Sequence, residues 1–173
     1  FTFLFFLFFL LLGFTIFSDY GISIDEDNTR INGLASLKYI FEIFNPSLLV
    51  SSNKLNEIIS LHEFKEQGIG VLFDLPTGFL EYMLNITDVR EYFLLRHFVN
   101  FIFFIIASYF FFLLIKERYQ SYIFGLVGVV FLILSPRIFA GSFYNNKDLV
   151  FLSMYIISLY FAINFLKKNT VKS

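Results

Sequence analysis

The sequence predicts an all-α, polytopic membrane protein with about four transmembrane helices and a long extracytoplasmic loop that carries interfacial helices. The first observation is composition: 57% of the 173 residues are hydrophobic and 28 are Phe, whereas soluble domains are about 45–50% apolar. The second observation is the distribution of acidic residues, since 12 of the 14 lie between Ser18 and Tyr92. Ionised side chains are costly in hydrocarbon, so this stretch is predicted to lie in the water beside the membrane.

Charge and cysteine content exclude further classes of protein and site. The formal net charge is -1 and the acidic residues gather in one loop, which argues against a nucleic-acid partner. No Cys is present, so neither a disulfide nor a thiolate metal site can hold that loop together. Folding is therefore expected to depend on packing in the membrane.

Residues 1–17 form an almost unbroken apolar run and are predicted to belong to a first transmembrane helix. The sequence starts with Phe, inside this run and without a basic flank. Ser18, Asp19 and Tyr20 do not resemble a signal-peptide cleavage site. We therefore expect that the sequence begins part-way through a longer protein.

Residues 18–92 are predicted to form the extracytoplasmic loop, which is long for a connection and contains helical patterns. Apolar residues recur at helical spacing from Thr29 to Phe44, which predicts an amphipathic helix on the membrane surface. Asn45 and Pro46 are expected to end this helix. A second short helix is predicted from Lys54 to Phe64.

The segment from Val71 to Leu84 decides the topology. It is apolar, yet it contains Asp74, Pro76 and Glu81. A spanning helix needs about 20 residues with few charges, so this segment is predicted to lie on the outer leaflet without crossing.

The remaining spans are predicted at residues 93–115, 120–138 and 149–166. With Val71 to Leu84 outside, the basic residues near the ends of these spans divide unequally between the two sides of the membrane. One side carries Lys116, Arg118, Lys167, Lys168 and Lys172, and the other carries only Arg137 and Lys147. The positive-inside rule then places both ends of the sequence in the cytoplasm and the loop on the outer face of the cell (inner) membrane.

A cluster of acidic residues follows the first span, at Asp19, Asp25, Glu26 and Asp27. A carboxylate held at the membrane surface can act as a catalytic base. Ile22 and Ile24 precede Asp25 and can hold it against the membrane, where partial loss of water strengthens a carboxylate as a base. The local sequence alone favours a simpler explanation, because acidic residues are enriched at helix starts and residues 25–28 would cap the next helix.

Three cations are predicted on the same side of the membrane as the acidic loop: Arg96, Arg137 and Lys147. Each of them, taken singly, is explained equally well as a side chain that reaches from a helix end to water. Arg96 is harder to explain in this way, because Arg96, His97 and Asn100 share one helix face of a Phe-rich span. Polar groups in that position usually line a cavity.

Four sequence elements, in this order, resemble the GT-C membrane glycosyltransferases, in particular the branch with protein O-mannosyltransferases and the lipid A aminoarabinose transferase. GISIDEDNTR is similar to the acidic pair in the family's first extracytoplasmic loop, which corresponds to Asp25 and Glu26. QGIGVLFDLPTGFLEYML resembles its proline-rich loop segment, here without the paired prolines. VREYFLLRHFVNFIFF and LSPRIFAGSFYNNKDLVF resemble the elements that open the second and fourth spans, which gives Arg96 and Asp148.

The resemblance implies transfer of a sugar from a polyprenyl-phosphate donor to a lipid, glycan or protein acceptor at the outer face, with inversion at the anomeric carbon. Asp25 is then the general base, and Glu26 orients the site or contacts a metal. Asp27 is expected only to cap the helix that begins near Thr29. Members of the family have many more spans, so the resemblance also implies that this is the N-terminal part of a longer protein and inactive alone.

For the donor, the resemblance implies that cations neutralise the leaving lipid phosphate, and Arg is suited to bidentate phosphate contacts. We expect Arg96 and either Arg137 or Lys147 to make these contacts, with Asp148 in a supporting role. The sugar is not specified by any of these residues.

A divalent metal is left open, since some relatives in this family use one and others do not. His62 could contribute to such a site, although a lone His beside Glu63 in a surface helix is more often solvated. Two alternatives belong to other classes: a non-enzymatic transporter or channel fragment whose acidic loop binds a cation, with Arg96 in gating, and a structural assembly subunit. Transporters more typically place their charges near the midplane of several helices, whereas here the charges gather at one surface.

Overall fold

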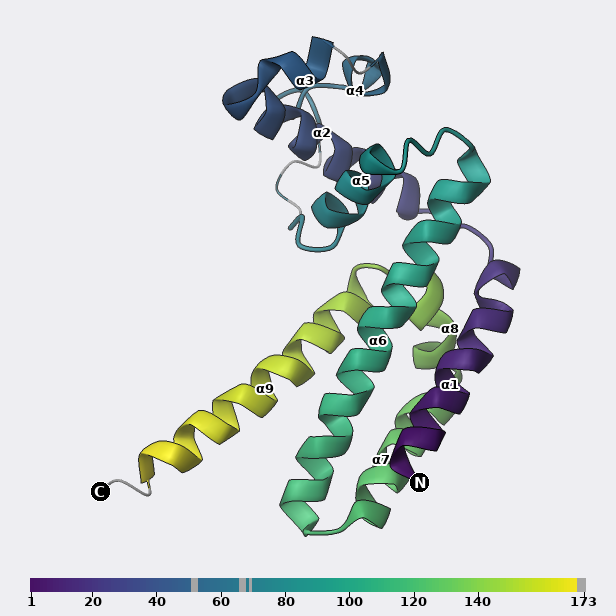
Figure 1. Cartoon of the computed structure of the whole chain (residues 1–173), viewed down its shortest axis with the longest axis vertical. Coiled ribbons are helices and arrows are strands. Elements are labelled where there is room, and N and C mark those ends of the chain that lie inside the picture. The colour runs from purple at the N-terminus through teal and green to yellow at the C-terminus, as the bar shows by residue number, and fades with distance from the viewer. Residues whose placement is uncertain (51–52, 66–67, 69, 171–173) are drawn as a thin grey trace. The chain divides into compact units, whose positions relative to one another are not determined.

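The computed structural model describes residues 1–50, 53–65, 68 and 70–170 (Figure 1). These residues form helices and connections without a β-strand, which confirms the predicted all-α class. The chain divides into two compact units. We call Phe1–Gly21 with His97–Ser173 the membrane unit, and Ile22–Arg96 the loop unit.

The described residues of the loop unit form four short or medium helices and the first turns of α6 (Val89–Tyr119). The four are α2 (Glu26–Phe44), α3 (Pro46–Val50), α4 (Asn53–Glu57) and α5 (Asp74–Met83). Its apolar core consists of Leu34, Leu37 and Phe41 from α2 with Leu55 from α4.

Two predicted helices of the loop unit differ in their bounds. α2 begins at Glu26, earlier than the predicted Thr29, and ends at Phe44 as predicted, because Asn45 precedes a proline and leaves the helical conformation. The predicted helix from Lys54 to Phe64 is wrong in its length, since α4 ends at Glu57. Just after the end of α4, the Ile58 carbonyl accepts a hydrogen bond from Lys38 Nζ at 2.7 Å. This bond takes the place of the backbone N–H that a continuing helix would offer.

The crossing of α2 and α5 depends on glycine. A Cβ atom on Gly33 would lie 2.2 Å from the carbonyl oxygen of Asp74, and one on Gly78 would lie 3.3 Å from the carbonyl carbon of Gly33. The two backbones can therefore approach closely only because Gly33 has no side chain. The short α5 also agrees with the prediction that Val71 to Leu84 does not cross the membrane, since ten residues are too few.

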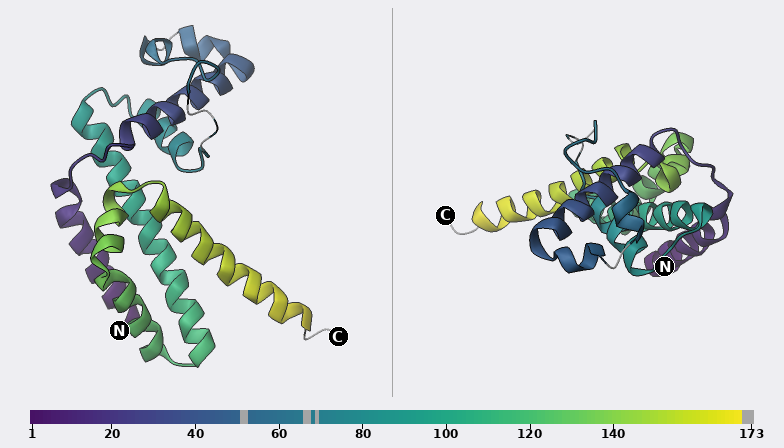
Figure 2. Two further views of the ribbon diagram at one scale, coloured as in Figure 1. Left: turned by 180° about the vertical axis from the view of Figure 1, so that it is seen from behind. Right: turned by 90° about the horizontal axis from the view of Figure 1, so that it is seen from above.

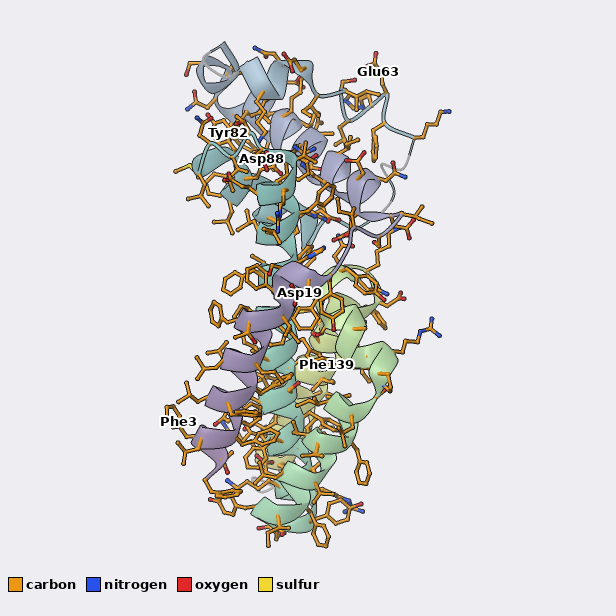
Figure 3. The ribbon with its side chains drawn as sticks, turned by 90° about the vertical axis from the view of Figure 1, so that its right-hand side faces the viewer. Phe3, Asp19, Glu63, Tyr82, Asp88 and Phe139 are labelled. Atoms are coloured by element: carbon orange, nitrogen blue, oxygen red, sulfur yellow. The ribbon has the colours of Figure 1, made fainter. Side chains whose placement is uncertain are left out.

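The membrane unit contains α1 (Thr2–Ile16), the 3-10 turn η1 (Phe17–Asp19), most of α6, α7 (Tyr122–Leu134), α8 (Pro136–Tyr144) and α9 (Asp148–Thr170). Aromatic rings form its core: Phe101 stacks on Phe143 with ring centroids 4.8 Å apart, and Tyr20 also stacks on Phe143, at 4.4 Å. Phe9 meets the Phe101 ring edge-on at 5.4 Å. The side chain of Phe3 is exposed on the outward side of α1 (Figure 3). Phe139, which Figure 3 also labels, lies on α8.

Three helices in the described part of the chain are long and apolar enough to cross a membrane: Thr2–Asp19, Val89–Tyr119 and Asp148–Lys168. The helices α7 and α8 become a fourth candidate only if they form one broken span, because they are bent by 73° at Ser135. The predicted single helix over residues 120–138 is therefore corrected to two helices. Pro136 explains the break, because a proline disfavours the helical conformation in the residue before it. The chain is thus a multi-pass membrane protein.

The helices of the membrane unit alternate in direction, so that several ends meet. Lys167 Nζ on α9 lies 2.9 Å from the Glu117 carboxylate on α6, and Lys116 Nζ lies 4.2 Å from the ring centroid of Tyr122 on α7. The N-terminus lies at the same end in Figures 1 and 2. The predicted grouping of Lys116 with Lys167 at one end of the spans is therefore observed, while Lys172 lies outside the described residues.

Candidate functional site

The candidate site is built around the turn that precedes α2. The backbone N–H of Ser23 donates to the Glu26 carboxylate at 2.7 Å, and the N–H of Glu26 donates back to the Ser23 carbonyl at 3.2 Å. Asp25 lies within this closed turn, and its carbonyl accepts the N–H of Thr29 at 3.1 Å. The backbone of Asp25 is therefore fixed while its side chain is exposed.

The structure places this cluster at the start of a helix, as the cap explanation predicts, but the roles of single residues differ. Because α2 starts at Glu26, Asp27 lies in the first turn and not in front of the helix, so its predicted capping role is wrong. Asp25 occupies the N-cap position, but its side chain makes no capping hydrogen bond. Ile24 is 97% exposed, so the apolar residue beside Asp25 is left uncovered by the loop unit.

Glu26 is buried, with 1% of its surface exposed. Its carboxylate closes the turn through Ser23, and its carbonyl accepts the Thr29 hydroxyl at 3.0 Å. These contacts agree with an orienting role for Glu26, because they hold the residue next to it in place. The predicted contact of Glu26 with a metal stays a prediction.

Arg96 is 2% exposed and makes three side-chain hydrogen bonds within the loop unit. Its Nη2 donates to Asp74 Oδ1 at 2.6 Å and to Thr29 Oγ1 at 3.0 Å, and its Nη1 donates to Thr77 Oγ1 at 3.1 Å. A buried ion needs such partners, because its removal from water costs several kcal/mol. Ion pairs and hydrogen bonds inside the protein have to offset that cost. The predicted contact of Arg96 with the donor phosphate stays a prediction, and a phosphate would have to replace these partners.

A second buried carboxylate, Glu81, lies on the same helix as Asp74. Arg30 approaches it with two nitrogens, Nη2 at 2.6 Å from Oε1 and Nε at 3.0 Å from Oε2, and Lys54 Nζ lies 2.7 Å from Oε1. The Arg30 guanidinium carbon also lies 3.6 Å from the ring centroid of Tyr92, at the start of α6. Glu81 thus links α2, α4 and α5.

From the sequence, Asp74 and Glu81 indicate only that their segment does not span the membrane, whereas in the structure they bind Arg96 and Arg30 and organise the loop unit. The signal was available in their spacing. Polar or small residues occur at i, i+3, i+4 and i+7 along α5, and all four are buried: Asp74, Thr77, Gly78 and Glu81. Such a stripe indicates a helix whose polar face points inward.

The other predicted site residues belong to the membrane unit. Arg137 is exposed in the first turn of α8, and Lys147 is partly buried before α9. Asp148 starts α9, and it exchanges two hydrogen bonds with Asn145: its N–H donates to Oδ1 at 2.9 Å and its carboxylate accepts from Nδ2 at 3.1 Å. These bonds give Asp148 a structural role at the start of the helix.

A divalent metal was left open by the sequence. In the part of the chain that the structure describes, no group of three or more His, Asp or Glu side chains is placed to hold a metal ion. His62 is exposed, and its ring meets that of Tyr39 edge-on with centroids 5.3 Å apart. His62 therefore does not belong to such a group among the described residues.

Comparison with known proteins leaves the family open. No protein-family model matches the chain, and no curated protein or solved structure is significantly similar to it. The resemblance to GT-C glycosyltransferases therefore rests on the four sequence elements alone, and it stays a prediction. A function has to be argued from the residues themselves.

Proposed function

We propose that this protein is a membrane glycosyltransferase that moves a sugar from a polyprenyl-phosphate donor to an acceptor hydroxyl or amine at the extracytoplasmic face. One observation carries the proposal: Asp25 presents an exposed carboxylate on a backbone that is fixed by Ser23, Glu26 and Thr29. General-base catalysis requires a carboxylate that is accessible and yet held in place.

In the proposed reaction, Asp25 accepts a proton from the acceptor as the acceptor atom forms a bond to the anomeric carbon. The bond between that carbon and the phosphate oxygen breaks, and the electron pair leaves with the polyprenyl phosphate. Attack from the face opposite the leaving group inverts the anomeric centre. Glu26 orients the turn that carries Asp25.

The proposed location is the inner cell membrane, with the loop unit outside the cytoplasm. The grouping of Lys116, Arg118, Lys167 and Lys168 near the ends of α6 and α9 supports this orientation, because basic residues are enriched on the cytoplasmic side. Membrane lipids and a lipid-linked sugar are the partners that this location implies.

The test compares two substitutions that change charge equally. In the complete protein, Asp25→Asn keeps the size of the side chain but removes the base, so turnover of a polyprenyl-phosphate sugar should fall about 10²–10⁴-fold with donor binding nearly kept. Asp27→Asn, two residues after Asp25 and inside α2, should change turnover little. Equal effects of the two substitutions, or unchanged turnover in Asp25→Asn, would remove the support for the transferase.

One observation favours the alternative of a transporter or channel. His97, Asn100 and Ser108 are all buried along α6, and buried polar groups within a span often mark a path for ions or substrates. Asn100 Nδ2 donates to the Gly141 carbonyl at 3.3 Å, which gives this residue a packing role between α6 and α8 as well. Unchanged turnover in Asp25→Asn would leave this alternative as the better explanation.

A further inference from the structure

We infer that Arg96 is a positioning residue that fixes the turn carrying Asp25, and that it acts through Thr29. This inference rests on the proposed function in one respect only, namely that Asp25 is the base. It assigns Arg96 a structural role in place of the phosphate binding that the sequence predicts.

A continuous chain of hydrogen bonds connects Arg96 with the turn. Arg96 Nη2 donates to Thr29 Oγ1 at 3.0 Å, and the same hydroxyl donates to the Glu26 carbonyl at 3.0 Å. The backbone N–H of Thr29 donates to the Asp25 carbonyl at 3.1 Å. Thr29 therefore binds both residues of the acidic pair, and Arg96 holds Thr29.

The guanidinium itself is also anchored on α5. Asp74 on α5 binds the same Nη2 at 2.6 Å, and Thr77 on α5 binds Nη1 at 3.1 Å. Charge-assisted bonds of this kind are stronger than bonds between neutral groups. The first turn of α2 is thereby fastened to α5 and to α6 through one buried cation.

Burial argues against direct contact between Arg96 and a ligand in this conformation. The side chain is 2% exposed, and its Nε atom is buried with no hydrogen-bond partner among the described residues. The other two nitrogens, Nη1 and Nη2, already donate to side chains on α5 and α2. A residue that is enclosed in this way acts by fixing its neighbours.

Amide hydrogen exchange of the full chain in lipid nanodiscs tests the inference. Thr29→Val keeps the shape of the side chain but removes the hydroxyl, so it should speed exchange of the amides at residues 26–30 by about tenfold or more. Exchange at residues 38–43, in the second half of α2, should stay within about twofold of the original protein. Thr29→Ser restores a hydroxyl and should restore slow exchange.

Thr77→Val provides a matched control. Thr77 and Thr29 are equally buried, both accept a hydrogen bond from Arg96, and both donate to a helix carbonyl. Thr77 lies on α5, however, and does not bind the Asp25 turn. Thr77→Val should therefore leave exchange at residues 26–30 unchanged.

Two results would overturn the inference: no faster exchange at residues 26–30 in Thr29→Val, or an equal increase there in Thr77→Val. A third result that would overturn it comes from a binding measurement with undecaprenyl phosphate as the probe. If Arg96→Lys weakened its binding tenfold or more while exchange at residues 26–30 stayed slow, Arg96 would be a phosphate ligand, as the sequence suggested. Hydrogen exchange does not depend on turnover, so this inference and the Asp25→Asn test can fail separately.

Discussion

Buried charges at individual residues distinguish the loop unit from an ordinary apolar core. Asp74, Glu81 and Arg96 are each nearly inaccessible, and each has an oppositely charged partner at 2.6 Å. Such pairs are not automatically stabilising, because removal of both ions from water offsets much of their attraction. We expect them to contribute to specificity, because a shifted register of α2 on α5 would separate Arg30 from Glu81.

The contribution of Glu81 can be measured by removing its charge. Glu81→Gln removes the carboxylate that both Arg30 and Lys54 contact, and breaking a buried ion pair typically costs about 3–5 kcal/mol. We expect a value near the lower end, about 3 kcal/mol, because both cations keep some exposure to water. Limited proteolysis of the loop unit should accordingly become about 100-fold faster, since its rate follows the population of the opened state.

An exposed acidic residue of the same unit serves as the comparison. Glu63→Gln makes the same chemical change at an exposed position, labelled in Figure 3, and should alter proteolysis by less than about twofold. If the two substitutions had similar effects, Glu81 would not organise the loop unit.

Among the elements, α5 is unusual because its polar side faces inward. Asp74, Thr77 and Glu81 are buried, whereas Phe79, Leu80 and Met83 are 44%, 39% and 61% exposed. An outward apolar face without charge is typical of a helix that lies in the membrane surface. The short connection from Met83 to Val89, where the candidate span α6 begins, makes that position available.

This placement of α5 predicts contact between Phe79 and lipid. The chain contains no Trp, so Phe79→Trp would report on one site only. In nanodiscs with brominated acyl chains, we expect strong quenching of the fluorescence of this Trp. Tyr82→Trp, on the side of α5 that packs against Phe41, should be quenched weakly. Absence of quenching at position 79, or equal quenching at both positions, would contradict a surface helix with one face in the lipid.

On the scale of the whole molecule, the absence of Cys makes topology directly measurable. The four-span arrangement places Glu117 in the cytoplasm, next to Lys167. We expect that Glu117→Cys in intact cells does not react with a membrane-impermeant maleimide, whereas Glu63→Cys does react. Labelling of position 117 from outside would show that the segment from Val71 to Leu84 crosses the membrane after all.

The sequence by itself determined the helical class, the approximate positions of the spans and the end of α2. The physical reason is that these features depend on local chemistry: hydrocarbon demands a long apolar run, and a proline disfavours helix in the residue before it. The break before Pro136 follows from the same rule, but length alone had suggested a continuous helix over residues 120–138. The location of the Asp25 and Glu26 pair at the start of a helix was likewise foreseeable.

Only the tertiary structure decided which charged residues are buried together. Arg96 meets Asp74 and Thr29, and Arg30 meets Glu81, across sequence separations of 22, 67 and 51 residues. No local pattern selects one partner over another at such separations, because the sequence around each carboxylate does not show which of the cations will pair with it. The choice follows from the close crossing of α2 and α5 at Gly33, which brings these particular side chains within hydrogen-bond distance. Arg96 could therefore be recognised from the sequence as an unusual residue, whereas its task could be inferred only from its partners.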